Sequence, residues 1–98
     1  MRGRLTNEIQ EKAKAFLGRE ISVRELRLYP YIDFSIKNKN CQGWSYAKLS
    51  KEEFPILNRL SEEGHLLYSP EKVIVSRKFY SYMQEVLAIG YVESFLEV

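Results

Sequence analysis

The stretch LNRLSEEGHLLYSPEKVIV, residues 57–75, decides the fold that we expect for this chain of 98 residues. It ends a helix at Gly64, because glycine adopts the left-handed conformation that closes helices without steric cost. Two short runs of β-forming residues follow, and Pro70 lies between them at the second position of a turn. The stretch therefore predicts a helix, a two-stranded β-hairpin and, after Ser76, a further helix.

Polar residues that can cap helices mark the start of each expected helix. The caps, with their capping-box partners where the spacing provides one, are Asn7 with Gln10, Ser22 with Glu25, Ser50 with Glu53, and Ser76. Gly18 ends the first helix. Pro30 must end or kink the second; residues 32–37 alternate like a strand, but we favour a kinked helix that continues to about Asn38. Pro55, in the second turn of the third helix as we place it, predicts a slight bend.

The apolar residues of these segments predict one core and, with it, the fold class. Their spacing gives one buried stripe per helix and one inward-facing side of the hairpin. The expected core is Ile9, Ala13, Phe16, Leu17, Ile21, Leu26, Ile32, Phe34, Phe54, Leu57, Leu60, Leu66, Val73, Val75, Phe79, Met83, Val86 and Leu87. Tyr29 and Tyr31 are also expected inside. We therefore expect residues 1–98 to form a single α+β domain, compact and mostly helical, with one two-stranded β-hairpin.

The composition places the chain among small globular proteins. Its residues are 45% hydrophobic and 29% charged, which excludes disordered and collagen-like chains. Apolar stretches such as Val86–Tyr91 are far shorter than the ~20 residues that span a membrane, and no secretory signal is recognisable. Because Cys41 is the single cysteine, no internal disulfide can form, which suits a reducing compartment. We therefore expect a cytoplasmic protein without a membrane-spanning segment.

Charge is distributed unevenly between the two halves. Residues 1–48 carry ten basic and five acidic side chains, a balance of +5, whereas residues 49–98 carry five basic and eight acidic ones, a balance of −3. The net charge of +2 is weak evidence for a nucleic-acid partner. The basic residues that could nevertheless share a face and contact nucleic acid are Arg19, Arg24, Arg27, Lys37, Lys39 and Lys48.

The segment of residues 49–90, a helix closed by Gly64, a short hairpin and another helix, resembles the winged-helix superfamily. This resemblance implies a wing-like hairpin and, as in many members, DNA binding through the helix before the wing. The expected helix over 50–63 has a charge balance of −2, which opposes contact with phosphates. The stretches ELRLYPYI (25–32) and EGH…VSRKF (63–79) also resemble small phage and prophage proteins, which implies no particular activity.

The sequence contains no constellation typical of an enzyme or a metal site. His65 follows a helix C-terminus, where a cationic ring complements the helix dipole, so we interpret it as structural and not as a general base. Cys41 has only Lys39 nearby to activate it. One cysteine and one histidine do not make an ordinary zinc site, and neighbouring glutamates diverge on a helix. We expect no catalytic activity, no metal and no cofactor.

Aromatic residues interleaved with lysines make residues 38–48 the most suggestive segment, because long loops in small domains often bind partners. Trp44 has two equal interpretations, as a plug of the core or as an anchor for a partner. The last helix is apolar on more than one side, so it is either central to the core or also used for self-association. The candidate partner contacts are Trp44, Tyr46, Lys37, Lys39, Lys48, Tyr91 and Phe95.

Three hypotheses about function follow. The first is a non-enzymatic interaction module, a protein-binding or regulatory protein of phage or prophage type, that binds another protein or a second copy of itself through the C-terminal helix. The alternative is a DNA-binding transcriptional regulator of winged-helix type that uses the basic N-terminal half. A small enzyme ranks last, because no residues with catalytic spacing are present.

Overall fold

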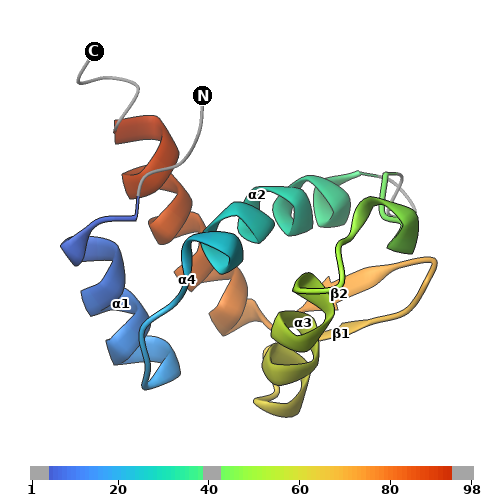
Figure 1. The fold of residues 1–98 in the computed structure, drawn as a ribbon. Helices are drawn as coiled ribbons and strands as arrows, with labels where there is room; N and C mark the ends of the chain where they lie inside the picture. Colours follow the sequence, from blue (N-terminus) through green and yellow to red (C-terminus); the bar gives the residue numbers. More distant parts are fainter. Residues whose placement is uncertain (1–4, 39–42, 94–98) are drawn as a thin grey trace.

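Four α-helices and one β-hairpin make up the structure, a computed structural model that describes residues 5–38 and 43–93 (Figure 1). From Tyr91 to Glu93 it describes the backbone only. In chain order the elements are α1 (Asn7–Leu17), α2 (Val23–Lys37), the 3-10 turn η2 (Tyr46–Lys48), α3 (Glu53–Glu62), β1 (Leu66–Tyr68), β2 (Val73–Val75), α4 (Arg77–Leu87) and the π-helical turn η3 (Ala88–Glu93). The expected α+β class, mostly helical, is confirmed.

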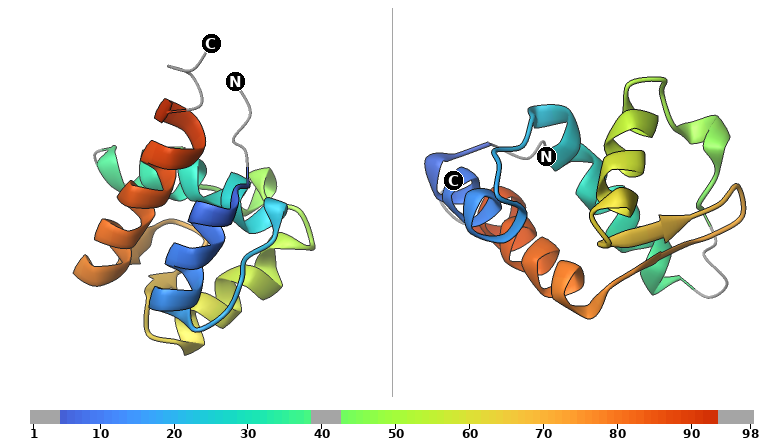
Figure 2. Two further views of the ribbon diagram at one scale, coloured as in Figure 1. Left: turned by 90° about the vertical axis from the view of Figure 1, so that its left-hand side faces the viewer. Right: turned by 90° about the horizontal axis from the view of Figure 1, so that it is seen from below.

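Helix α2 lies at the centre and separates two groups of elements (Figures 1 and 2). On one side α1 and α4 pack against each other with opposite chain directions. On the other side α3 packs against β1, and β2 packs against α2. Because α2 contacts elements of both groups, its buried residues hold the two sides together.

The expected helix ends at Gly18, Ser22 and Ser76 are confirmed in atomic detail. Gly18 has φ 79° and ends α1, and the hydroxyls of Ser22 and Ser76 accept hydrogen bonds that start α2 and α4. The expected cap of α1 is wrong: Thr6, one residue before Asn7, accepts the bond from the backbone N–H of Ile9. Local spacing did not separate the two residues, because both carry a side-chain oxygen that can cap a helix.

Helix α2 continues through Pro30 to Lys37, with Asn38 as its C-terminal cap, so the helical interpretation of residues 32–37 is confirmed. The third helix begins later than expected, at Glu53. Instead of capping the helix, Ser50 donates from its N–H and its hydroxyl to the Glu53 carboxylate, at 2.9 Å each. Pro55 therefore lies in the first turn, where its missing N–H removes no helical hydrogen bond, and the predicted bend has no basis.

The hairpin follows α3 through the turn that the sequence predicts. Gly64 has φ 82°, and the N–H of His65 bonds to the carbonyl of Leu60 at 2.9 Å, which is the hydrogen bond of a Schellman C-terminus. The antiparallel strands then pair Leu66 with Val75, Leu67 with Ile74 and Tyr68 with Val73. The predicted hairpin around the Pro70 turn is thus confirmed.

The core consists mainly of the residues expected there. Those found buried as expected are Ile9, Ala13, Ile21, Leu26, Ile32, Leu57, Leu60, Leu66, Val73, Phe79, Met83 and Val86. Phe16, Leu17, Val75 and Leu87 pack at its edge. Phe34 was wrongly placed: it is 56% exposed, because it lies about 200° around α2 from the buried Ile32. Phe54 is only half-buried, with its ring edge-on to Tyr46. Leu28 and Tyr82, absent from the expected set, are buried.

Candidate functional site

The outer face of the hairpin carries two large aliphatic side chains in the solvent. Strand residues alternate between faces, so Leu66 and Val73 point into the core while Leu67 and Ile74 point outward. Leu67 is 62% exposed and Ile74 is 54% exposed, and the two are direct cross-strand partners. The solvent face of an antiparallel sheet is ordinarily polar, so this aliphatic pair is unusual for a face without a binding role.

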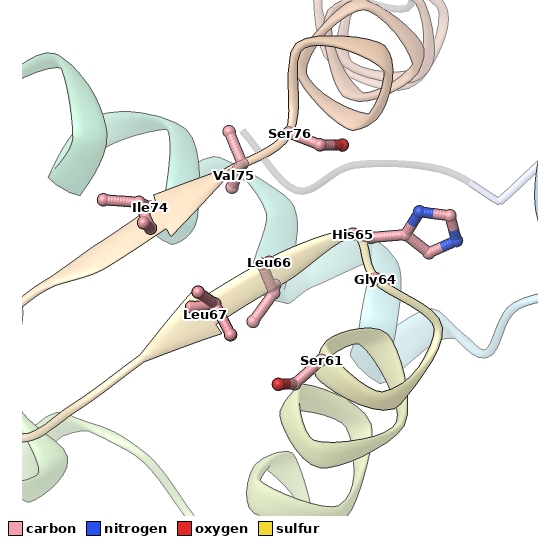
Figure 3. Close-up of a pocket in the computed structure, with 8 residues that line it drawn as sticks. All are labelled: Ser61, Gly64, His65, Leu66, Leu67, Ile74, Val75 and Ser76. Carbon is pink, nitrogen blue, oxygen red and sulfur yellow. The ribbon is translucent and has the colours of Figure 1, made fainter.

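Shallow hollows flank this aliphatic pair on both sides. A hollow of about 330 Å³ is lined by Leu67 and Ile74 together with the end of α3 and the start of α4 (Figure 3). Ser61 of α3 lies at its rim, and the His65 ring points away from Leu67 (Figure 3). A second hollow, of about 200 Å³, runs from the same pair toward the turn at Ser69. We call this surface, defined by Leu67, Ile74 and the two hollows, the hairpin face.

Trp44 belongs to the core. It is 6% exposed, its ring stacks on Tyr31 at 5.3 Å, and its indole N–H donates to the Ser69 carbonyl at 2.7 Å. Tyr31 holds the same segment by donating to the Gly43 carbonyl at 2.6 Å and accepting from the Ser45 N–H at 2.8 Å. The indole therefore links the segment after residue 42 to the hairpin turn. Of the two interpretations offered for Trp44, the structure shows the one in the core.

The other predicted partner contacts are scattered. Tyr46 is half-buried, 5.1 Å from the Phe54 ring, and Lys48 is exposed. Lys37 forms an ion pair with Asp33 at 3.1 Å, and this hydrogen-bonded contact raises the pKa of the lysine. Lys39, the side chain of Tyr91 and Phe95 lie outside the described residues, as does Cys41.

The predicted basic face is interrupted by acidic partners. Arg24 and Arg27 of α2 line one hollow together, but Glu53 lines it as well, and Arg24 lies 3.9 Å from Glu52. Arg19 is largely buried and is bound by carboxylates, so it is withdrawn from the surface. Among the proposed nucleic-acid contacts that the structure describes, which excludes Lys39, Arg24 and Arg27 are the two that line a common hollow.

A buried polar network, which the sequence did not reveal, links α2 to α4. The Glu25 carboxylate is 3% exposed; it accepts from the Tyr29 hydroxyl at 2.7 Å and pairs with Arg19 at 3.1 Å. The hydroxyls of Tyr29 and Tyr82 lie 3.2 Å apart. The spacing of Glu25 and Tyr29, one helical turn apart, was the available sequence signal.

The ionisation of this network favours a structural role. Burial raises the pKa of Tyr29 strongly and that of Tyr82 to about 12, so both hydroxyls remain protonated near neutrality. Burial by itself would lower the pKa of Arg19, but the Glu25 charge and hydrogen bond outweigh it, and the pKa is raised. The Arg19 guanidinium is thus held in its charged form, with its carboxylate partners already bound.

The remaining residues considered for chemistry are placed in packing roles. The half-buried ring of His65 stacks on Phe79 at 5.6 Å and lies 4.9 Å from the Phe16 ring. Within residues 5–38 and 43–93, no group of three or more His, Cys, Asp or Glu side chains could hold a metal ion. None of the described helices is long and apolar enough to cross a membrane.

Comparison with known proteins returned no match to a family model, to a curated protein or to a solved structure. Function must therefore be inferred from the geometry of the surfaces themselves.

Proposed function

We propose that this protein is a non-enzymatic interaction module that binds another protein through the hairpin face. The observation that supports this proposal is the exposure of the directly paired Leu67 and Ile74. Burying such a side chain is worth about 1.5–3 kcal/mol, so covering the pair would contribute substantially to affinity. The neighbouring hollows provide concave surface for side chains of the partner.

The fold itself does not depend on this pair. Leu66 and Val73, on the opposite face of the strands, are 3% and 1% exposed and anchor the hairpin to the core. Threonine is favoured in β-strands, so replacing Leu67 and Ile74 by threonine preserves the strands and removes only outward-facing apolar surface. Binding and folding are therefore separable by mutation.

The test is retention of proteins from the cell that makes this chain. Immobilised wild type, the double variant Leu67→Thr/Ile74→Thr and a control variant, Val23→Thr, would be compared by mass spectrometry. Val23 is a suitable control because it is an exposed apolar residue, at 42%, on α2 and away from the hairpin. We expect the same protein to be retained by wild type and control and lost from the double variant. Equal retention by all three, or no retention by wild type, would overturn the proposal.

DNA binding of the winged-helix type receives less support from the surfaces. The solvent-exposed positions of α3 and its flanks include Glu52, Glu62 and Glu63 against Lys51 and Arg59. Each carboxylate at a phosphate opposes binding, because only cations release counterions from the duplex. A duplex-binding titration at low salt separates the two functions, since the interaction module is expected to show no binding that falls steeply with salt.

A further inference from the structure

A second and larger groove runs between α1 and α4, away from the hairpin face. Its volume is about 620 Å³, nearly twice that of the hollow beside Leu67. It lies along the C-terminal half of α1 and the N-terminal half of α4, which run in opposite directions (Figure 2). We call it the α1–α4 groove.

The floor of the α1–α4 groove is aromatic. Phe16 of α1 and Tyr82 of α4 stack nearly parallel, with ring centroids 4.8 Å apart and an interplanar angle of 10°. Tyr82 is 3% exposed, whereas Phe16 is half-buried, so Phe16 provides the accessible part of this pair. Ala15 beside it has a short side chain and leaves the groove open.

The rim of the groove is basic. Lys12, Arg77 and Lys78 line it, and Glu85, 3.9 Å from Lys12, is the acidic residue among the lining side chains. Arg77 and Lys78 occupy the first turn of α4, which contains no acidic residue. Cations at this end of a helix face the positive pole of the helix dipole and destabilise the helix slightly. Among the described side chains Arg77 and Lys78 have no ion-pair partner, so their positive charge is concentrated where it does not serve folding.

We infer that the α1–α4 groove binds an acidic segment of a partner protein in which apolar residues alternate with carboxylates. Apolar side chains of that segment pack on the Phe16 edge of the floor, and its carboxylates pair with Lys12, Arg77 and Lys78. The inference is independent of the hairpin face, because it rests on different residues and on charge complementarity.

Two other occupants fit the groove less well. Single-stranded nucleic acid binds such surfaces by stacking bases on open aromatic faces, but the Phe16 face parallel to Tyr82 is already covered by that ring. A symmetric contact between two copies would bring the same cations together, because the same patch faces itself across a two-fold axis. An acidic partner segment satisfies both the apolar floor and the basic rim.

The test selects ligands from a library of short random peptides displayed on phage and panned on the full-length protein. We expect the recovered peptides to be rich in Asp and Glu with interspersed aliphatic residues. A labelled recovered peptide would then be titrated by fluorescence anisotropy at low and high salt. Affinity is expected to fall with salt, because exposed charge pairs are screened.

Two variants and one control locate the binding site. Arg77→Glu/Lys78→Glu is expected to weaken peptide binding by about tenfold or more, as attraction becomes repulsion. Ala15→Leu, which fills the groove with a good helix former, is expected to weaken it as well. The control Lys48→Glu alters an exposed lysine outside the groove and is expected to bind normally. Arg77→Glu/Lys78→Glu places acidic residues in the first turn of α4, where they complement the helix dipole. The Tm of this variant is therefore expected to equal or exceed that of wild type, which excludes unfolding as the cause of lost binding.

Every other result counts against the inference. It fails if no acidic sequences are enriched, or if Arg77→Glu/Lys78→Glu binds the peptide as wild type does. Tighter binding of a labelled single-stranded oligonucleotide at the same residues would assign the groove to nucleic acid. A wild-type dimer in light scattering that Arg77→Glu/Lys78→Glu dissociates would assign it to a second copy. The Leu67→Thr/Ile74→Thr variant is expected to bind the peptide normally, so failure at one surface is distinguishable from failure at the other.

Discussion

Replacement of Glu25 is the sharpest test of how the two sides of the molecule are joined. The carboxylate is 3% exposed and holds Arg19 at 3.1 Å and the Tyr29 hydroxyl at 2.7 Å. In Glu25→Leu both partners lose this acceptor, while a side chain of similar size avoids a large cavity. Arg19 retains Glu63 at 3.3 Å, and Tyr29 retains the Tyr82 hydroxyl at 3.2 Å. Because these contacts remain, we expect the decrease in the free energy of unfolding to lie at the lower end of the range measured for broken buried ion pairs.

The magnitudes follow from the bonds that each variant removes. Removing one partner of a buried ion pair costs about 3–5 kcal/mol, so Glu25→Leu is expected to lower the free energy of unfolding by about 3 kcal/mol. Glu25→Gln keeps the shape but has only one acceptor oxygen, so it can accept from Arg19 or from the Tyr29 hydroxyl and its amide donor faces the other; the expected loss is about 1–3 kcal/mol. The free energy of unfolding of a native domain is only about 5–15 kcal/mol, so the loss expected for either variant is a large fraction of it.

Urea and thermal denaturation would measure these losses through the fluorescence of Trp44, the single tryptophan, which is buried in the folded protein. At this chain length 3 kcal/mol corresponds to a decrease in Tm of about 12–24 °C. Glu20→Gln is the matched control, because Glu20 pairs with Lys14 at 3.4 Å on the surface and its loss costs less than about 0.5 kcal/mol. If Glu25→Leu is no more destabilising than this control, the buried network does not stabilise the fold as reasoned here.

Three further predictions test local features. Gly64→Ala is expected to cost about 1 kcal/mol through backbone strain at φ 82° alone, since an added Cβ would meet no atom within 4 Å, and an unchanged urea midpoint would contradict this. Thr6→Ala is expected to cost about 1 kcal/mol and Asn7→Ala much less, because Thr6 accepts the capping bond; the reverse order in denaturation would restore the sequence-based cap. Because the pKa of Tyr82 is raised from about 10 to about 12, its stabilising contribution is complete below pH 10 and is lost as pH rises through 12. Between pH 10 and 12 the free energy of unfolding is therefore expected to fall less steeply with pH in Tyr82→Phe than in wild type. Parallel curves for the two proteins would contradict the raised pKa of Tyr82.

The elements of the fold could be predicted because their signals are local. Ser22 and Ser76 bond to N–H groups three residues away, and Gly18 and Gly64 end helices by their own conformation. Errors arose where two local signals competed. Ser50 and Glu53 have capping-box spacing, yet their hydrogen bonds form before the helix begins, and Pro55 then fits its first turn.

The candidate surfaces could not be predicted, because they depend on packing between distant segments. Trp44 reaches Ser69, 25 residues away, and nothing near either residue encodes that contact. Strand alternation left Leu67 and Ile74 out of the expected core, but their exposure depends on what covers the hairpin. The burial of Glu25 similarly requires Arg19 and Tyr82, which come from two other segments.

The side chain of Gln10 bonds to both backbone groups of one residue in the connection between α1 and α2. Its carbonyl accepts from the Ile21 N–H at 2.9 Å, and its amide donates to the Ile21 carbonyl at 2.8 Å, as a neighbouring strand would. The Ile21 amide, although outside every helix and strand, should therefore exchange its hydrogen with solvent as slowly as amides in regular structure. Glutamate at position 10 has only acceptor oxygens and could not donate to the Ile21 carbonyl. Gln10→Glu should therefore loosen the connection between α1 and α2 and speed the exchange of the Ile21 amide.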